Sequence, residues 1–150
     1  MRILLIHQYY LEDDDHGGSR WNEINRKWTE EGHQVTVIAG MMHYTSSQKR
    51  EEYKGKWFKK KTQGAVEVMR CHVSESYNAN FAGRLWAYFS FVFSSCWAGL
   101  FKVKGKYDVI IVTSPPLFVG ISGYLISLFK RTPYVFEIRD LWPESAIDTG

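Results

Sequence analysis

The sequence predicts an α/β fold in which helices cover a Rossmann-like, doubly wound parallel sheet. Short apolar runs that suit buried strands alternate along the chain with segments of helical period, which is the pattern of parallel strands joined by crossover helices. The first run, residues 3–6, has no polar alternation, as expected of a central strand covered on both faces. A chain of 150 residues with 45% hydrophobic side chains can also bury an ordinary core, which excludes a disordered or fibrous protein.

The start of the chain predicts a β-α-β unit. Residues 3–6 are a continuous apolar run and residues 34–39 are rich in β-branched side chains, so both are predicted strands. A helix is predicted between them, with Ser19 as its cap and Gly32 at its end. The residues whose three-and-four spacing indicates this helix are Trp21, Ile24, Asn25 and Trp28.

The remaining elements follow from the same signals. Residues 41–64 are polar and basic without a clear period, which predicts a long surface loop with a short helix around residues 48–53. Further along, the sequence predicts a strand at 66–73, a loop at 74–83, a helix at 84–101, a strand at 107–112, a helix at 117–129 and a strand at 134–138.

Charge, cysteine and histidine usage exclude several function classes. The net charge of +3 is too slight to predict a nucleic-acid partner. Cys71 and Cys96 are far apart and form no CxxC pair, which excludes zinc-ribbon and thioredoxin-type chemistry and suits a reducing cytoplasm. His33, His43 and His72 show no metal-ligand spacing, so we expect no metal site.

A phosphate or sugar contact is predicted in the loop between the first strand and the first helix. Gly17 and Gly18 let a ligand approach the backbone, and unpaired N–H groups at a helix start attract phosphate beside Ser19 and Arg20. A turn whose glycines serve only backbone geometry is the alternative. The dinucleotide fingerprint GxGxxG is absent, which disfavours a dehydrogenase. His7 could also face this cleft, although a lone histidine suits a satisfied core or rim position.

Polar residues also follow the last two predicted strands. Ser114 could bind a ligand at the rim of the sheet, or its Ser-Pro-Pro segment could be a rigid exit from the strand. Arg139 is suited to clamp a phosphate or sugar, and Asp140 to orient or deprotonate a hydroxyl. We expect the Glu137 carboxylate to be paired with another side chain of the core or hinge, for instance Arg139, since an unpaired buried carboxylate is costly. The alternative for this cluster is a structural salt bridge.

Residues 85–101 carry no charge and are flanked by basic side chains. A helix that spans a membrane needs about 20 apolar residues, so this segment is short for that role. A helix buried against the sheet is a second reading, but its all-round hydrophobicity leaves an aromatic outer face. We favour a helix that packs on the sheet and rests on an anionic membrane surface. The residues expected to face the membrane are Trp86, Phe89, Phe93, Trp97, Lys102 and Lys104.

Three stretches of the sequence resemble a known family. They are RILLIHQYY followed by a glycine pair before the first helix, YDVIIVTSPPLFVG, and PYVFEIRDLWPES. Together they resemble the N-terminal domain of family 4 glycosyltransferases of the two-domain GT-B fold, over essentially all 150 residues. The most similar branch comprises bacterial capsule and O-antigen enzymes, including L-fucosamine transferases.

This resemblance implies a retaining, metal-independent transfer of a sugar, N-acetyl-L-fucosamine in the L-fucosamine branch. The donor would be a UDP-linked sugar, the acceptor a polyprenyl-diphosphate-linked glycan, and no cofactor is expected. The resemblance places Gly17 and Gly18 against the donor diphosphate, with the rest of the domain on the acceptor side. Many relatives carry a His-Asp pair where this chain has Arg139 and Asp140, which leaves Asp140 as the candidate to position the reacting sugar or hydroxyl.

The same resemblance sets expectations for organisation and location. We expect residues 1–150 to be a truncated N-terminal, acceptor-side domain, without the C-terminal donor-binding domain and inactive alone. We expect it to lie peripherally on the cytoplasmic face of the plasma membrane. Two other classes stay open: a nucleotide-binding oxidoreductase or epimerase domain, and a non-catalytic membrane-binding module.

Overall fold

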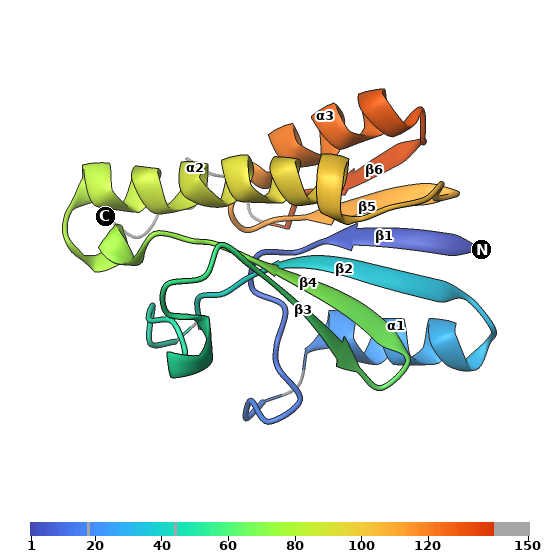
Figure 1. The fold of residues 1–150 in the computed structure, drawn as a ribbon, viewed down its shortest axis with the longest axis horizontal. Helices are drawn as coiled ribbons and strands as arrows, with labels where there is room; N and C mark the ends of the chain where they lie inside the picture. Colours follow the sequence, from blue (N-terminus) through green and yellow to red (C-terminus); the bar gives the residue numbers. More distant parts are fainter. Residues whose placement is uncertain (18, 44, 140–150) are drawn as a thin grey trace.

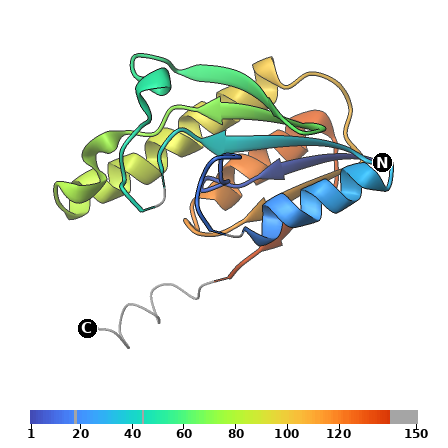
Figure 2. The same ribbon diagram turned by 90° about the horizontal axis from the view of Figure 1, so that it is seen from below.

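The computed structural model describes residues 1–17, 19–43 and 45–139. They form a six-stranded sheet in the order β3-β4-β2-β1-β5-β6, with helices on both faces (Figures 1 and 2). Adjacent strands pair in parallel except β3, which runs antiparallel to β4. The strands are β1 (Arg2–Ile6), β2 (Gln34–Gly40), β3 (Phe58–Gln63), β4 (Val66–Cys71), β5 (Val109–Thr113) and β6 (Tyr134–Glu137).

Within the described residues, three α-helices cover the sheet, α1 on one face and α2 and α3 on the other (Figure 1). Because side chains alternate along a strand, β1 contributes to both layers of the core. Leu4 and Ile6 pack with residues of α2 and α3, whereas Ile3 and Leu5 pack on the α1 side. The helices are α1 (Arg20–Glu30), α2 (Phe81–Trp97) and α3 (Val119–Lys130), with short 3₁₀ turns η1 (Glu51–Tyr53) and η2 (Glu75–Asn78).

Most predicted elements are confirmed, with ends shifted by a few residues. The predicted helix at 84–101 begins earlier, at Phe81, and its last turn, η3 (Ala98–Lys102), is π-helical. Ser19 does precede α1, but its side chain makes no capping hydrogen bond in the structure.

The short helix predicted around residues 48–53 is confirmed as η1, but the prediction of a loop for the rest of residues 41–64 is wrong, because β3 lies within it. Its three consecutive lysines look like a solvated segment, yet each finds a carboxylate on the folded chain. Lys59 pairs with Glu52, Lys60 with Glu67 and Lys61 with both Glu12 and Glu52. Glu12 is 49 residues from Lys61, Glu67 lies on the paired strand β4, and Glu52 lies in the short turn η1, so the local alternation of the sequence does not reveal these partners.

Candidate functional site

A cavity of about 500 Å³ opens at the carboxyl ends of β1, β2, β5 and β6. Loops that leave neighbouring parallel strands meet at this edge, which is where doubly wound sheets bind ligands. The β1–α1 loop contributes glycine and basic groups, the segment after β2 contributes an imidazole and a hydroxyl, and the chain after β6 contributes a guanidinium. The residues used below are His7, Gly17, Arg20, His43, Thr45 and Arg139.

The cavity brings together most of the residues that the sequence predicts for ligand binding. Gly17, Ser19, Arg20 and Arg139 all line it. Gly17 has a φ of +110°, a backbone conformation that L side chains rarely adopt, and the space around its α-carbon is open. Gly18 and Asp140 lie outside the residues that the structure describes.

Ser114 is not among the residues that line the cavity, but it contacts one that is. Its side chain is buried, and its Oγ accepts a hydrogen bond of 2.8 Å from the backbone N–H of Arg139. This bond fixes the chain just after β6 to the segment just after β5. Ser114 therefore holds Arg139 in place, and a direct contact between Ser114 and a ligand stays a prediction.

Glu137, at the end of β6, pairs with Arg20 rather than with Arg139. Its other carboxylate oxygen accepts a hydrogen bond of 2.7 Å from the Thr113 hydroxyl. Burial tends to raise the pKa of Glu137, but the hydrogen bonds from Thr113 and Arg20 outweigh it and hold the pKa below its ordinary value. The first turn of α1 is thereby tied to the far side of the cavity.

His7 forms part of the cavity wall at the end of β1 and is only 5% exposed. Burial, reinforced by the positive charge of Arg139, lowers its pKa to about 4. The imidazole is therefore neutral at physiological pH. Its Nδ1 has no hydrogen-bond partner among the described residues.

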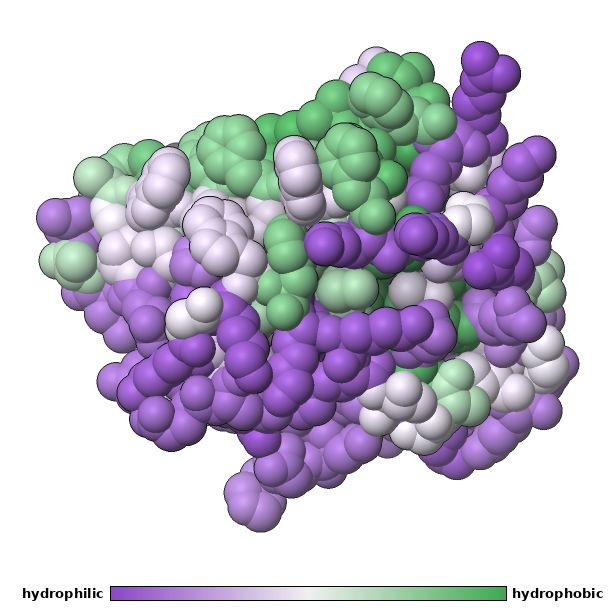
Figure 3. All heavy atoms as spheres, viewed as in Figure 1, coloured by the Kyte–Doolittle hydropathy of each residue, from purple (hydrophilic) through white to green (hydrophobic). Residues whose placement is uncertain are grey.

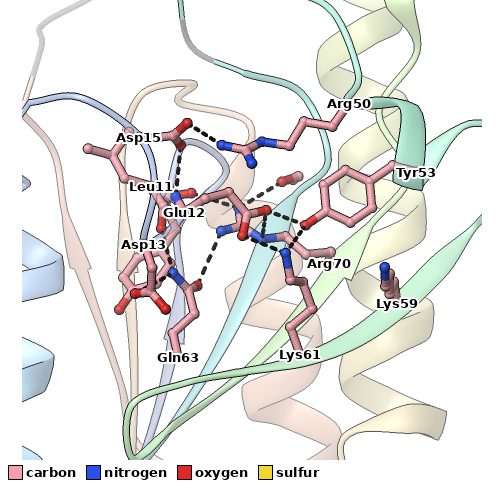
Figure 4. Close-up of polar contacts among 12 residues, drawn as sticks. Leu11, Glu12, Asp13, Asp15, Arg50, Tyr53, Lys59, Lys61, Gln63 and Arg70 are labelled. Carbon is pink, nitrogen blue, oxygen red and sulfur yellow. Dashed lines mark hydrogen bonds and ion pairs between the residues drawn. The ribbon is translucent and has the colours of Figure 1, made fainter.

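A buried ionic network anchors the β1–α1 loop to the β3–β4 pair (Figure 4). The Glu12 carboxylate lies 3.1 Å from Arg70 Nε and 3.0 Å from Lys61 Nζ, and accepts a hydrogen bond from the Tyr53 hydroxyl. Burial and this hydrogen bond raise the pKa of Tyr53 to about 12. Arg70 also donates to the carbonyl oxygen of Tyr10 at 2.7 Å. Sequence reasoning missed this network because it depends on β3.

The outer surfaces of α2 and α3 form an apolar face, on the other side of the sheet from α1 (Figures 1 and 3). Trp86, Phe93 and Trp97 are exposed there, as are Lys102 and Lys104 nearby. Phe89 is half-buried, because its ring packs against Phe118 at a centroid distance of 4.9 Å. The structure adds exposed side chains on α3 that the sequence did not single out, namely Ile121, Tyr124, Leu125, Leu128 and Phe129.

The described part of the chain contains neither a candidate membrane-spanning helix nor a candidate metal site. None of its helices combines the length and the hydropathy that crossing a membrane requires. Among the same residues, no three or more His, Cys, Asp or Glu side chains are grouped so that they could hold a metal ion.

Among the residues of the cavity wall that sequence reasoning did not assign to a site are His43 and Thr45. A signal was available: both follow the predicted strand at 34–39 closely, and the carboxyl ends of parallel strands share one edge. His43 contacts Asp15 of the β1–α1 loop, and spacing in the sequence does not predict that these two side chains meet.

The fold defines an α/β domain with a doubly wound, mainly parallel sheet, and the glycine and arginine groups at this edge are of the kinds that suit a phosphate. The family of glycosyl transferase 4-like domains matches residues 17–149, and the chain belongs to this family. It is also 27% identical over 150 residues to WcaI of Escherichia coli (strain K12), a protein named for a glycosyl transferase of colanic acid biosynthesis. The match covers 100% of this chain and 37% of that protein.

A solved structure shares the fold. It is described as trehalose-6-phosphate from E. coli bound with UDP-2-fluoro glucose, and it matches with a TM-score of 0.51 and 13% identity. The match covers 91% of this chain and 32% of that one. The predicted Rossmann-like sheet of a GT-B glycosyltransferase is thus confirmed as a fold, and the predicted resemblance to family 4 glycosyltransferases is confirmed as membership of the domain family. The L-fucosamine branch stays a prediction.

Proposed function

We propose that this chain is the acceptor-side domain of a retaining glycosyltransferase. In this proposal the enzyme transfers a sugar from a UDP-linked donor to a polyprenyl-diphosphate-linked glycan, without a metal, in capsule or O-antigen synthesis. The family supports glycosyl transfer, and the naming of the relative for colanic acid biosynthesis supports polysaccharide synthesis. The structural neighbour is described with a UDP-sugar bound, which supports that class of donor.

The cavity at the strand ends is the observation that carries this proposal. Arg20 and Arg139 supply positive charge, and Gly17 allows close backbone approach at the start of α1. A sugar diphosphate needs both features, because its phosphates pair with guanidinium groups and helix N–H groups. In this proposal Gly17, Gly18, Ser19 and Arg20 contact the donor diphosphate, and Asp140 positions the reacting sugar or hydroxyl.

The proposal places the enzyme on the cytoplasmic face of the plasma membrane. A polyprenyl-linked acceptor keeps its hydrocarbon chain in the bilayer, so the protein must work at that surface. The exposed aromatic face of α2 and α3, with Lys102 and Lys104 at one end, supports contact with an anionic leaflet.

Sugar transfer by the full-length protein tests the proposal. The assay offers UDP-, GDP- and dTDP-sugars, including UDP-N-acetyl-L-fucosamine, with polyprenyl-diphosphate-linked glycans, and measures lipid extension by mass. We expect extension with one UDP-sugar, retention at the anomeric carbon by NMR of the product, and unchanged turnover in EDTA. Tight NAD binding without transfer would favour an oxidoreductase or epimerase. Vesicle binding with no donor binding or hydrolysis would favour a membrane-binding module.

A pair of glycine variants tests the donor contact. Gly17 and Gly32 both have positive φ and open space around the α-carbon, but only Gly17 lines the cavity. Gly17→Val and Gly32→Val should therefore bring similar backbone strain. We expect Gly17→Val to raise the Kd for the donor about tenfold or more and Gly32→Val to leave it unchanged, as measured by calorimetry on the full-length protein. Equal donor affinities in the two variants would contradict the assignment.

A further inference from the structure

The segment after β2 holds a histidine whose two ring nitrogens are both engaged. Its Nε2 lies 3.1 Å from Oδ1 of Asp15, in the β1–α1 loop. Its Nδ1 lies 3.3 Å from the backbone nitrogen of Thr45 and 2.9 Å from the Thr45 hydroxyl. These three residues, Asp15, His43 and Thr45, are called the Asp15–His43–Thr45 chain below.

The contacts of His43 determine its tautomer. A backbone N–H can only donate, so the bond from Thr45 N requires an unprotonated Nδ1. The ring hydrogen is then on Nε2 and is donated to the Asp15 carboxylate. It follows that the Thr45 hydroxyl also donates to Nδ1, and that Nδ1 acts as a hydrogen-bond acceptor.

Asp15 is built to hold this tautomer. Its side chain is 7% exposed, its Oδ2 accepts a hydrogen bond of 2.8 Å from the backbone N–H of Glu12, and its Oδ1 pairs with Arg50. Burial tends to raise the pKa of Asp15, but the hydrogen bonds from Glu12 and Arg50 outweigh it and hold the pKa below its ordinary value. The carboxylate therefore stays ionised and keeps Nε2 as the donor.

The Nδ1 side of the ring belongs to the cavity. His43 and Thr45 both line it, together with Gly17 of the β1–α1 loop and Arg20 at the start of α1. His7, which is 95% buried and has an unpartnered Nδ1, lines the same cavity. The wall thus combines guanidinium groups that suit a phosphate with imidazole nitrogens that suit a neutral hydroxyl.

Thr45 shows which group Nδ1 accepts from, because its side chain is a secondary alcohol, like the hydroxyls of a sugar ring. That side chain is exposed, so a ligand hydroxyl can displace it. We propose that Nδ1 of His43 binds a hydroxyl of the acceptor sugar in place of the Thr45 hydroxyl, with Asp15 as the positioning residue. This subsite rests on the glycosyltransferase function proposed above and names a part of its acceptor site.

The test compares acceptor and donor kinetics in the full-length protein. The probe acceptors are polyprenyl-diphosphate-linked glucose, galactose and N-acetylglucosamine, with the nucleotide sugar that supports transfer. We expect His43→Leu to raise the acceptor KM about tenfold, because a hydrogen bond to the sugar is lost, and to leave the donor KM unchanged. His43→Asn, whose amide oxygen can accept near the position of Nδ1, should give an intermediate acceptor KM.

Two aspartates provide a matched pair. Asp14 and Asp15 both accept from Arg50, but only Asp15 contacts His43. The amide of Asp15→Asn can donate to Nε2 and so favours the tautomer whose Nδ1 cannot accept. We expect Asp15→Asn to raise the acceptor KM and Asp14→Asn to leave it unchanged. A merely structural role of Asp15 in holding Arg50 would change the acceptor KM and the donor KM together, whereas the subsite predicts a change in the acceptor KM alone.

Thr45→Val distinguishes the subsite from a local structural contact. Removing the hydroxyl that competes for Nδ1 should lower the acceptor KM, whereas loss of a stabilising contact would not improve binding. An unchanged acceptor KM in His43→Leu, or a donor KM that rises in its place, overturns the subsite and leaves the proposed function standing. Absence of transfer by the wild-type protein with every probe would instead overturn the proposed function, and the subsite with it.

Discussion

His7 directly follows β1, where it is buried in the protein and also lines the wall of the cavity. A charged imidazole there would lack water, so burial and the nearby Arg139 lower its pKa to about 4. The same location makes the neutral ring available to a ligand. Because the folded protein disfavours the protonated ring, we expect His7 to lower the stability of the fold at acidic pH.

The lowered pKa of His7 predicts a specific pH dependence of stability. The pKa of His7 falls from 6.5 to about 4 on folding, so the unfolded chain binds the proton first as the pH is lowered. Between these values the free energy of unfolding should decrease by about 3 kcal/mol through His7 alone. Urea denaturation of wild type and His7→Leu at pH 7, 5 and 4 measures this difference. His16→Gln, at an exposed histidine, is the control, and identical pH profiles for wild type and His7→Leu would contradict the prediction.

For single residues, the sequence predicted which side chains lie at the cavity better than it predicted which side chains contact each other. Gly17, Ser19, Arg20 and Arg139 were located correctly at the cavity, because strand ends and helix starts can be inferred from pattern. The partner of Arg20 was not, because Glu137 is 117 residues away and meets it only once the sheet is assembled. His43 was missed for the same reason, since its partner Asp15 lies in the β1–α1 loop and meets it only in the folded chain.

Among the elements, β3 changes the interpretation of the β1–α1 loop. Lys61 of β3 and Arg70 of β4 hold Glu12, so the edge of the sheet fixes the start of the loop that carries Gly17 (Figure 4). The sequence predicted a loop here because three lysines in a row obscure the alternation of an edge strand. The missing information was the set of carboxylates that the lysines meet in the folded chain.

A double-mutant cycle tests this anchoring. Arg70→Met leaves the buried Glu12 carboxylate with a weaker set of partners and should lower the free energy of unfolding by about 3–5 kcal/mol. Adding Glu12→Gln removes the unpaired charge, so the double variant should be less destabilised than the sum of the two single variants. Lys60→Met, at the exposed pair with Glu67, should cost less than about 1 kcal/mol. Strict additivity in urea denaturation would exclude the coupling.

The whole molecule has two unlike faces across one sheet. The face of α1 carries charged side chains, whereas α2 and α3 present exposed aromatic and aliphatic groups together (Figure 3). Residues 85–101 gave a sequence signal for this second face, but the contribution of α3 was not anticipated because its apolar positions suited a buried helix equally well. Soluble proteins rarely expose so contiguous an apolar surface without a partner.

Vesicle binding tests this face. Trp86→Asp with Trp97→Asp should abolish co-sedimentation of the full-length protein with phosphatidylglycerol vesicles, because both exposed rings would be replaced by anionic groups. Arg26→Gln with Lys27→Gln, on exposed positions of α1, changes the net charge by the same amount and should leave binding nearly intact. Equal losses in the two double variants would show that net charge, and not the apolar face, governs binding. Circular dichroism checks that both remain folded.

The lysines of β3 also affect the tendency of the protein to aggregate. It is an outer strand, so its unpaired backbone groups could template another chain, and the opposite outer strand, β6, is only four residues long. Lysines on an outer strand oppose such pairing, because a second copy would bring like charges into register. Neutralising Lys59, Lys60 and Lys61 together would therefore increase aggregation at high concentration through strand addition at this edge.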